Sequence, residues 1–233
     1  MLIPIIIICL GAVALFWFLF EKVKAYSLKA VFIKTTASML FVVLGAYGLY
    51  KTNLKAFSLF TVIGLSLGML GDIFLDLKYV FKEKDFEFTL AGFIVFGLGH
   101  ICYTTGLLLE FYTNQNVLYI IIPLVLAVLM GPGSLLMEKT LKLNYGKLRW
   151  AAFCYAIAIF GFLFSGFSVW MMMGFKNTGL MMAFVGIIAF VTSDMILNFT
   201  YFGKDHEKPF DIISNTITYY GAQYVIALAI LFM

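Results

Sequence analysis

Residues 57–79 read FSLFTVIGLSLGMLGDIFLDLKY. The segment is apolar over the roughly 20 residues that a helix needs to cross a bilayer, yet it contains Asp72 and Asp76. A carboxylate at the centre of a membrane-spanning helix costs about 2.5–3.5 kcal/mol on insertion scales, so proteins rarely keep one there without a use. The segment therefore predicts a helix within a membrane and a functional site on that helix.

The local pattern around Asp72 occurs a second time near the end of the chain. Residues 71–79, GDIFLDLKY, align with residues 193–201, SDMILNFTY, so Asp194 and Asn198 take the places of Asp72 and Asp76. Residues four apart lie on one face of a helix. Each copy therefore predicts two polar side chains on one side of a helix, and we expect that side to face the protein interior because lipid does not solvate it.

The rest of the chain is also apolar, with 63% hydrophobic and 12% charged residues. Soluble domains have about 25% charged residues. We therefore expect an all-α fold, a polytopic membrane bundle of about eight transmembrane helices, which forms a single transmembrane domain over residues 1–233. The expected spans are 2–20, 28–50, 57–79, 88–110, 117–137, 150–173, 178–202 and 210–232.

Two of these spans have special features. The fifth contains Pro123 and Gly131-Pro132-Gly133, which predict a kink or a break in the helix. The first span has no basic region before it and no small-residue cleavage site after it, so we expect a retained span and not a cleaved signal peptide.

Basic residues are distributed unevenly among the connections. Twelve Lys and Arg residues lie in the connections that follow the first, third, fifth and seventh spans, and three lie in the opposite connections. Because basic connections stay in the cytoplasm, we expect these four connections inside and both termini outside. The compact chain suggests a prokaryotic inner membrane.

This orientation brings polar residues of several spans to a similar depth. Asp72 and Asp194 fall in the cytoplasmic halves of their spans, whereas the outer half of the bundle has almost no such residues. Supporting residues expected around the two aspartates are Lys34, Asp76, His100, Tyr103, Asn198, Asn215, Tyr219 and Gln223. Spans one to four run in the same directions as spans five to eight, so the repeated motif is compatible with two parallel four-helix repeats.

These residues also have structural interpretations. A hydrogen bond between transmembrane helices contributes only about 0.6 kcal/mol on average, which is small beside the cost of burying a carboxylate and favours a function for the aspartates. His100 is either a core histidine or part of the site. Lys34 either reaches towards the inner interface or pairs with a carboxylate or a phosphate, and Tyr103, Tyr219 and Gln223 also suit ordinary interhelical hydrogen bonds.

The sequence points to no cofactor, no metal site and no nucleic-acid partner. His100 is the only histidine at membrane depth, and the three cysteines lie far apart, which does not match zinc-ligand spacing. No phosphate-binding glycine loop, GxSxG elbow or dinucleotide fingerprint occurs. The net charge of +4 lies in the connections, where basic residues set the orientation of a membrane protein.

The order of several short motifs resembles the lysoplasmalogenase-like membrane proteins, the YhhN-like family. The similarity lies in Lys34, Gly71-Asp72 with Leu75, Gly92-Phe93 with Phe96, His100-Ile101-Cys102-Tyr103, Ser193-Asp194 and Tyr219-Tyr220-Gly221-Ala222-Gln223. These motifs extend over most of the chain. One departure is Thr35, because the family often has proline after this lysine.

The resemblance implies a multi-span hydrolase that cleaves the vinyl ether of lysoplasmalogens to a fatty aldehyde and glycerophosphocholine or glycerophosphoethanolamine. Vinyl ethers are cleaved by acid, so such an enzyme needs one protonated carboxyl group and one ionised carboxylate, as glycosidases do. We expect Asp72 and Asp194 to form this pair. The sequence leaves open which of the two is the acid. Asp76 is expected to tune the carboxyl pair or to bind the substrate, and His100 to orient the site or to carry protons. Lys34 is expected to hold the phosphate of the lysophospholipid. The lipid tail is expected along the apolar outer half of the bundle.

Two other functions remain compatible with the sequence. Aspartate and histidine chains within membranes also build the proton relays of transporters and channels, and parallel repeats occur in transporters. A non-catalytic bundle that binds membrane lipids is the third possibility. The bare outer half favours a one-sided pocket over a conduction path, and the oligomeric state stays open.

Overall fold

The computed structural model describes residues 2–24, 27–53, 55–112, 115–203 and 209–233, and in these ranges it is all α-helical. The α-helices are α1 (Leu2–Lys24), α2 (Leu28–Lys51), α3 (Ala56–Val80), α4 (Asp85–Phe111), α5 (Leu118–Thr140), α6 (Arg149–Met172), α7 (Thr178–Phe202) and α8 (Pro209–Ala229). Short 3₁₀ segments lie at Lys82–Lys84, Gly146–Leu148 and Ile230–Phe232. The expected spans are thus confirmed as helices, with ends that differ by a few residues.

Seven of the described helices, α1 to α7, are long and apolar enough to cross a membrane. Helix α8 is less apolar because it carries Asp211, Asn215 and Gln223. It packs against α7, α2 and α3 and leaves one side exposed at Phe210 and Ile217. Gln223 is fully buried, which is where a membrane protein tolerates a polar side chain.

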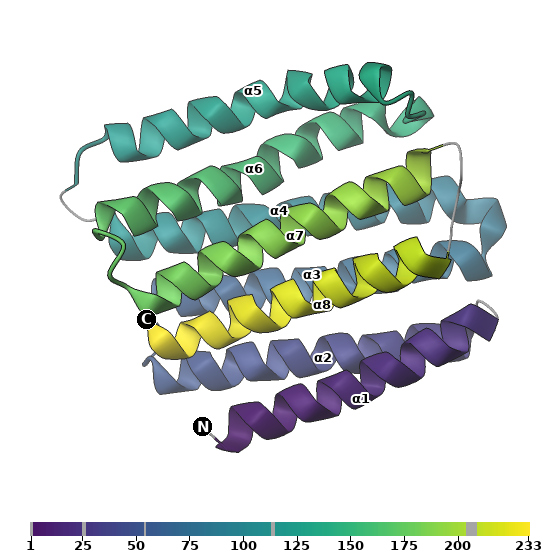
Figure 1. Cartoon of the computed structure of the whole chain (residues 1–233), viewed down its shortest axis with the longest axis horizontal. Coiled ribbons are helices and arrows are strands. Elements are labelled where there is room, and N and C mark those ends of the chain that lie inside the picture. Colours follow the sequence, from purple (N-terminus) through teal and green to yellow (C-terminus); the bar gives the residue numbers. More distant parts are fainter. Residues whose placement is uncertain (1, 25–26, 54, 113–114, 204–208) are drawn as a thin grey trace.

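Both termini lie at the same end of the bundle (Figure 1). The end of α1, the start of α2, and the connections from α3 to α4 and from α5 to α6 lie at the opposite end. This second end is the one that carries most of the basic residues. Lys204 and Lys208, which contribute to the charge count, lie outside the described residues, as does the side chain of Lys24.

The helices pair in a pattern that repeats after four helices. In the first half, α1 packs on α2, α2 on α3 and α3 on α4. In the second half, α5 packs on α6, α6 on α7 and α7 on α8. The halves join through α4 with α6 and through α8 with α2, which are also equivalent pairs. This arrangement agrees with two parallel four-helix repeats, with α3 and α7 in equivalent places (Figure 1).

The fifth span was expected to kink or break, and the break is wrong, because α5 continues through Pro123 and Pro132. Proline at position 123 removes the N–H that would bond to the carbonyl group of Tyr119. The hydroxyl group of Ser168, on α6, donates a hydrogen bond of 2.7 Å to that carbonyl oxygen instead. A neighbouring helix therefore satisfies the freed backbone group, which is how transmembrane helices tolerate proline.

Helices α3 and α4 approach each other closely because glycines line their contact. A Cβ atom at Gly71 would lie 2.5 Å from the ring of Phe96, and one at Gly64 would overlap the ring of Tyr103. Small residues at such positions are typical of helix contacts in membranes. The close approach places α4, with His100 and Tyr103, directly against α3, which carries the first copy of the motif.

Candidate active site

A cavity of about 210 Å³ lies among the helices towards the end that carries the α1–α2 and α5–α6 connections. All eight helices contribute to its wall. Both Asp72 and Asp194 line it, together with Lys34, Asn198, Asn215 and Tyr219. Two acidic side chains from the two copies of the motif therefore share one internal space.

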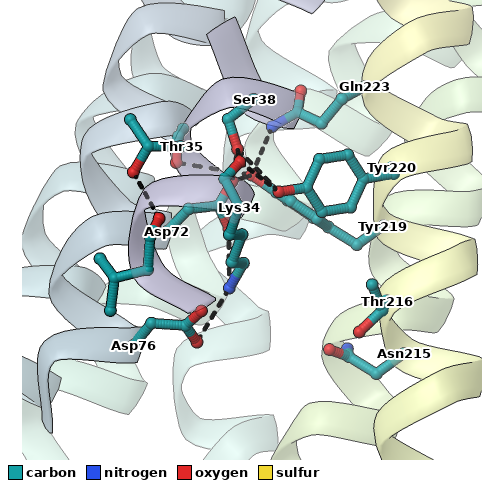
Figure 2. Close-up of polar contacts among 12 residues, drawn as sticks. Lys34, Thr35, Ser38, Asp72, Asp76, Asn215, Thr216, Tyr219, Tyr220 and Gln223 are labelled. Atoms are coloured by element: carbon teal, nitrogen blue, oxygen red, sulfur yellow. Dashed lines mark hydrogen bonds and ion pairs between the residues drawn. The ribbon is translucent and has the colours of Figure 1, made fainter. Parts of the chain in front are cut away.

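Asp72 is surrounded by donors and by a positive charge. Ser38 donates to Oδ2 over 2.7 Å and Tyr219 over 3.0 Å, and Lys34 Nζ lies 3.4 Å from Oδ1. The hydroxyl group of Tyr220 lies 2.7 Å from that of Ser38 and orients it. Figure 2 shows these side chains of α2 and α8 converging between the two helices. Asp72 is 3% exposed, so the surrounding groups replace the water that an ionised carboxylate needs.

A chain of hydrogen bonds leads from α4 to Asp72. Tyr103 donates to Gln223 Oε1 over 3.1 Å, and Gln223 Nε2 donates to the Tyr219 hydroxyl group over 3.0 Å. Tyr219 then donates to Asp72. Each donor in this series points towards Asp72, so the hydroxyl group of Tyr219 accepts from Gln223 and donates to the carboxylate. Tyr103 and Gln223 stand behind Tyr219 and do not line the cavity.

Asp76 lies one helical turn beyond Asp72 and pairs with two lysines. Lys22 Nζ lies 3.4 Å and Lys34 Nζ 3.2 Å from Asp76 Oδ1. Figure 2 shows Lys34 reaching Asp76. These two lysines and two aspartates balance in charge, which lowers the cost of burying each. The hydroxyl group of Thr35 donates to the carbonyl oxygen of Val31 over 2.8 Å, and α2 continues through this position.

Asp194 has a different environment. Tyr155 of α6 donates to Oδ2 over 2.5 Å, while Oδ1 makes no hydrogen bond to a described residue and no lysine or arginine in the described ranges pairs with it. His100 Nε2 lies 3.1 Å from the same Tyr155 hydroxyl group. His100 is buried, with Nδ1 unpartnered in the described structure. A second chain, from His100 through Tyr155, therefore ends on Asp194.

The two asparagines connect the cavity to its surroundings. Asn198 donates to the hydroxyl group of Tyr145 over 3.0 Å, and Asn215 donates to the carbonyl oxygen of Ser193 over 2.7 Å. Tyr145 lies in the connection between α5 and α6, outside the membrane-spanning segments. Burial raises the pKa of its phenol above the ordinary value, which keeps it neutral as a partner of Asn198.

The connection between α5 and α6 covers one end of the cavity. The backbone N–H of Asn144 donates to the carbonyl oxygen of Phe202 over 2.9 Å, and Leu143, Tyr145 and Leu148 pack with Phe202. Glu138 accepts hydrogen bonds from the backbone N–H of Tyr145 and from Arg149 Nε. Polar and apolar contacts thus hold this segment over the ends of α5 and α7.

The structure places the residues chosen from the sequence in two groups. Lys34, Asp76, Tyr103, Tyr219 and Gln223 belong to the Asp72 cluster, and His100 to the Asp194 cluster. Asn198 and Asn215 line the cavity without bonding to either aspartate among the contacts found. Asp72 and Asp194 line one cavity but share no hydrogen bond.

Sequence reasoning missed three residues that contact the aspartates or their partners. Ser38 binds Asp72, Lys22 pairs with Asp76, and Tyr155 binds Asp194. Lys22 counted only as a basic residue of a connection. Tyr155 lies six residues after Arg149, the start of α6, at a depth similar to that of the motif residues, but a tyrosine at that depth does not stand out from ordinary interhelical hydrogen-bonding residues.

Within the described ranges, no group of three or more His, Cys, Asp or Glu side chains is placed to hold a metal ion. The polar side chains that line the cavity offer carboxyl, hydroxyl, amide and ammonium groups. Such groups bind polar head groups and transfer protons.

Comparison with protein families gives a match to the YhhN family over residues 29–230. No curated protein and no solved structure matches the chain at a significant level. The matched range includes both copies of the motif and every residue of the two clusters except Lys22. The chain is therefore a multi-pass membrane protein that belongs to the YhhN family.

Proposed function

We propose that this protein is a membrane hydrolase that cleaves the vinyl-ether bond of lysoplasmalogens. The YhhN family contains lysoplasmalogenase, and the proposal rests on one observation about the cavity. Two aspartates from equivalent helices line it, one with a cation beside it and one with only a neutral hydroxyl group. Acid cleavage of a vinyl ether needs one protonated and one ionised carboxyl group, and enzymes separate two such roles by environment.

The environments support a role for each aspartate. Asp194 acts as the general acid, because no described cation compensates its charge and Oδ1 is left to carry the proton. Asp72 acts as the ionised partner, because Lys34, Ser38 and Tyr219 stabilise its negative charge. Tyr155 orients the acid through Oδ2, and His100 positions Tyr155.

The reaction balances with water as the only co-reactant. Asp194 gives its proton to the alkenyl carbon that does not bear oxygen, which leaves an oxocarbenium ion beside ionised Asp72. Water adds to the carbon of that cation and passes a proton to Asp72. The hemiacetal then collapses: Asp72 returns its proton to the departing glycerol oxygen, and Asp194 takes the proton of the hemiacetal hydroxyl group. The fatty aldehyde and the glycerophospho-alcohol leave, and both aspartates regain their starting states.

Lys34 and Lys22 are suited to the phosphate of the substrate. Both line the cavity, and both already contact Asp76. An ammonium group has three donors, so Lys34, which contacts Asp72 and Asp76, has capacity for a phosphate oxygen in addition to the two carboxylates. With the basic end of the bundle in the cytoplasm, the head group would be bound from the cytoplasmic side.

The distribution of ionisable groups favours this reading over a transporter. The aspartates and lysines of the two clusters lie in the half of the bundle nearer the basic end, and His100 lies near mid-depth. The other half of the described core contains large apolar side chains such as Phe57 and Leu107, together with uncharged polar ones such as Thr61. Proton relays within membranes use ionisable groups, and a conduction path requires such groups towards both faces, whereas a pocket for one reaction requires them on one side only.

The test is product analysis of the purified protein in deuterated water. Incubated with vinyl-ether and ester-linked lysophospholipids, the protein should release aldehyde from the vinyl ether alone. Because the proton of Asp194 exchanges with solvent, the aldehyde should carry one deuterium on the carbon next to the carbonyl group. Rapid reduction of the aldehyde to an alcohol preserves this label for mass spectrometry.

Two outcomes would contradict the proposal. Release of fatty acid from the ester-linked lipid with no aldehyde would assign a different hydrolase reaction. Proton flux in proteoliposomes without any lipid product would assign a transporter.

A further inference from the structure

The cavity extends sideways from the aspartates towards α5. This part of its wall consists of apolar side chains and small residues, among them Met130, Gly133 and Met137 of α5, Phe160 of α6 and Met195 of α7. Met130 and Phe160 lie near the middle of their helices, so this apolar part reaches the depth of the hydrocarbon. Methionine side chains adapt to flexible apolar ligands, which suits a hydrocarbon chain.

The two halves of the bundle differ at this place. In the first half, Lys22 of α1 pairs with Asp76 of α3 and joins the outer helix to the motif helix. In the second half, Asn198 occupies the place of Asp76 but bonds to Tyr145 of the connecting segment. Among the described residues, no hydrogen bond or ion pair joins α5 to α7. The outer helix of this half is therefore held chiefly by α6.

The connecting segment closes the end of the cavity between α5 and α7. The side of the cavity between these two helices has no comparable hydrogen bond among the described residues. The connection between α5 and α6 is bonded to the end of α7 through Asn144 and Phe202. Along the helices, α5 presents Leu126, Leu129 and Leu136 outwards and Gly133 inwards to the cavity. A Cβ atom at Gly133 would meet only Met130 Cε, at 3.8 Å, so the wall is thin at this residue.

We infer that the space between α5 and α7 holds the hydrocarbon chain of a single-chain phospholipid, which enters from the bilayer at Gly133. The inference rests on the proposed function for the identity of the head group, and it names the tail site of that substrate. Apolar surface at hydrocarbon depth favours a lipid chain over water. The whole cavity, including the part beside the aspartates, measures about 210 Å³, which is below the roughly 300–1,000 Å³ of pockets that enclose a drug-sized ligand, so it is too small for two chains.

From the sequence, we expected the lipid tail along the outer half of the bundle. The inference places it between α5 and α7 instead. The outer half contains fully buried Phe57, Leu107 and Phe162, and none of them lines the cavity. Dense packing of this kind leaves no room for a chain without displacing side chains. The α5 side already has that room.

Photo-crosslinking tests the site without requiring turnover. The full-length protein in nanodiscs is labelled with a single-chain phospholipid that carries a photoreactive group at the end of its tail. Labels should appear on Met130 or Met137, which line the cavity, and should be removed by an excess of unlabelled single-chain lipid but not by a two-chain lipid. Labels on outward-facing Leu129 and Leu136 report the surrounding bilayer and should resist this competition.

Two matched variants complete the test. Gly133→Trp fills the proposed site and should lower competed labelling about tenfold, since it removes apolar contacts that contribute about 0.8 kcal/mol per methylene. Gly221→Trp is the control, because Gly221 is exposed on α8 with no atom within 4 Å of a Cβ atom there. It should leave labelling unchanged.

Competed labels on α1 or α3, unchanged labelling in Gly133→Trp, or no competed label on α5 would each overturn the tail site. The proposed hydrolysis is judged separately by aldehyde release. Competed labels on α5 without aldehyde would support the tail site and contradict the reaction. Aldehyde release with labels elsewhere would do the opposite.

Discussion

Asp72 and Asp194 occupy equivalent positions in two copies of one motif, but their environments differ. Asp72 receives hydrogen bonds from Ser38 and Tyr219 and lies 3.4 Å from a lysine ammonium group. Within the described part of the chain, the side chain of Asp194 receives one hydrogen bond, from Tyr155. The comparison teaches that a repeated backbone can hold two carboxyl groups in one cavity while neighbouring helices give them different environments.

Lys34 and Tyr155 illustrate how this difference arises. Lys34 is six residues after the start of α2, and Tyr155 is six residues after the start of α6, so the two residues occupy equivalent places in the halves. One supplies a positive charge and the other a neutral hydroxyl group. A change of residue type at one position of the repeat therefore gives the two aspartates different environments.

The largest expected effect is that of Asp194→Asn on activity. The amide keeps the shape and the oxygen that accepts from Tyr155 but cannot donate a proton to carbon. Aldehyde release should fall by about 10²–10⁴-fold, the usual contribution of a general acid. Mass spectrometry of the aldehyde measures the rate, and thermal unfolding in detergent should show little change.

Asp194→Glu is the control for this variant, because it restores the acid with a longer side chain. Partial recovery of activity is expected. Near-native turnover by Asp194→Asn would remove Asp194 from the chemistry and leave the comparison without a functional meaning.

The next largest effect is that of Asp72→Asn on stability. Removing one member of a buried ion pair leaves an uncompensated charge and costs about 3–5 kcal/mol. Lys22 and Lys34, which are mostly buried, would then both pair with Asp76. Denaturant unfolding in detergent should therefore show a much larger loss for Asp72→Asn than for Asp194→Asn.

A double substitution sharpens this result. Lys34→Gln together with Asp72→Asn restores the charge balance between Lys22 and Asp76 and should recover part of the lost stability, although activity stays low. Equal stability losses in Asp72→Asn and Asp194→Asn would show that the two environments do not differ as the contacts indicate.

A smaller effect is expected from the two tyrosines that contact the aspartates. Tyr155→Phe removes the only hydrogen bond found for Asp194 and leaves His100 Nε2 without its partner, a cost of about 1–3 kcal/mol. Tyr219→Phe leaves Asp72 with Ser38 and Lys34. Activity measured as kcat and KM should fall further in Tyr155→Phe, mainly through kcat, because the acid loses its orientation. The reverse order would contradict the role given to Tyr155.

The smallest effect concerns the first position of the motif. Ser193→Ala removes a hydroxyl group that lies 2.9 Å from Asn215 Nδ2, and the carbonyl oxygen of Ser193 still accepts from Asn215. A loss of about 0.5–1.5 kcal/mol is expected. Gly71→Ala, at the equivalent position, should cost about 1–3 kcal/mol by overpacking, since Phe96 lies against Gly71. Thermal unfolding of both variants under one condition gives the order.

The comparison also shows which parts of the site were within reach of sequence reasoning. The motif copies identified Asp72 and Asp194, and helical spacing identified Asp76 and Asn198, because these signals are local. Ser38 and Tyr155 carry no local signal, since serine and tyrosine are common in transmembrane helices as ordinary hydrogen-bonding residues. Their importance depends on which helices lie beside α3 and α7.

The continuous helix at Pro123 has the same explanation. Sequence reasoning predicted a kink or a break there because proline removes a backbone donor. The hydroxyl group that satisfies the freed carbonyl group belongs to Ser168, which is on the next helix. A local rule could not include that partner.

By itself, the sequence determined the class of protein, the eight helices, the repeated motif and the half of the bundle in which the acidic residues lie. These properties follow from apolar length and helical period, which act within one segment. Only the tertiary structure decided that Lys34 lies beside Asp72, that Tyr155 lies beside Asp194, and that the shared cavity extends towards α5. The reason is physical: charge compensation and cavity shape depend on side chains from different helices, and packing sets their distances.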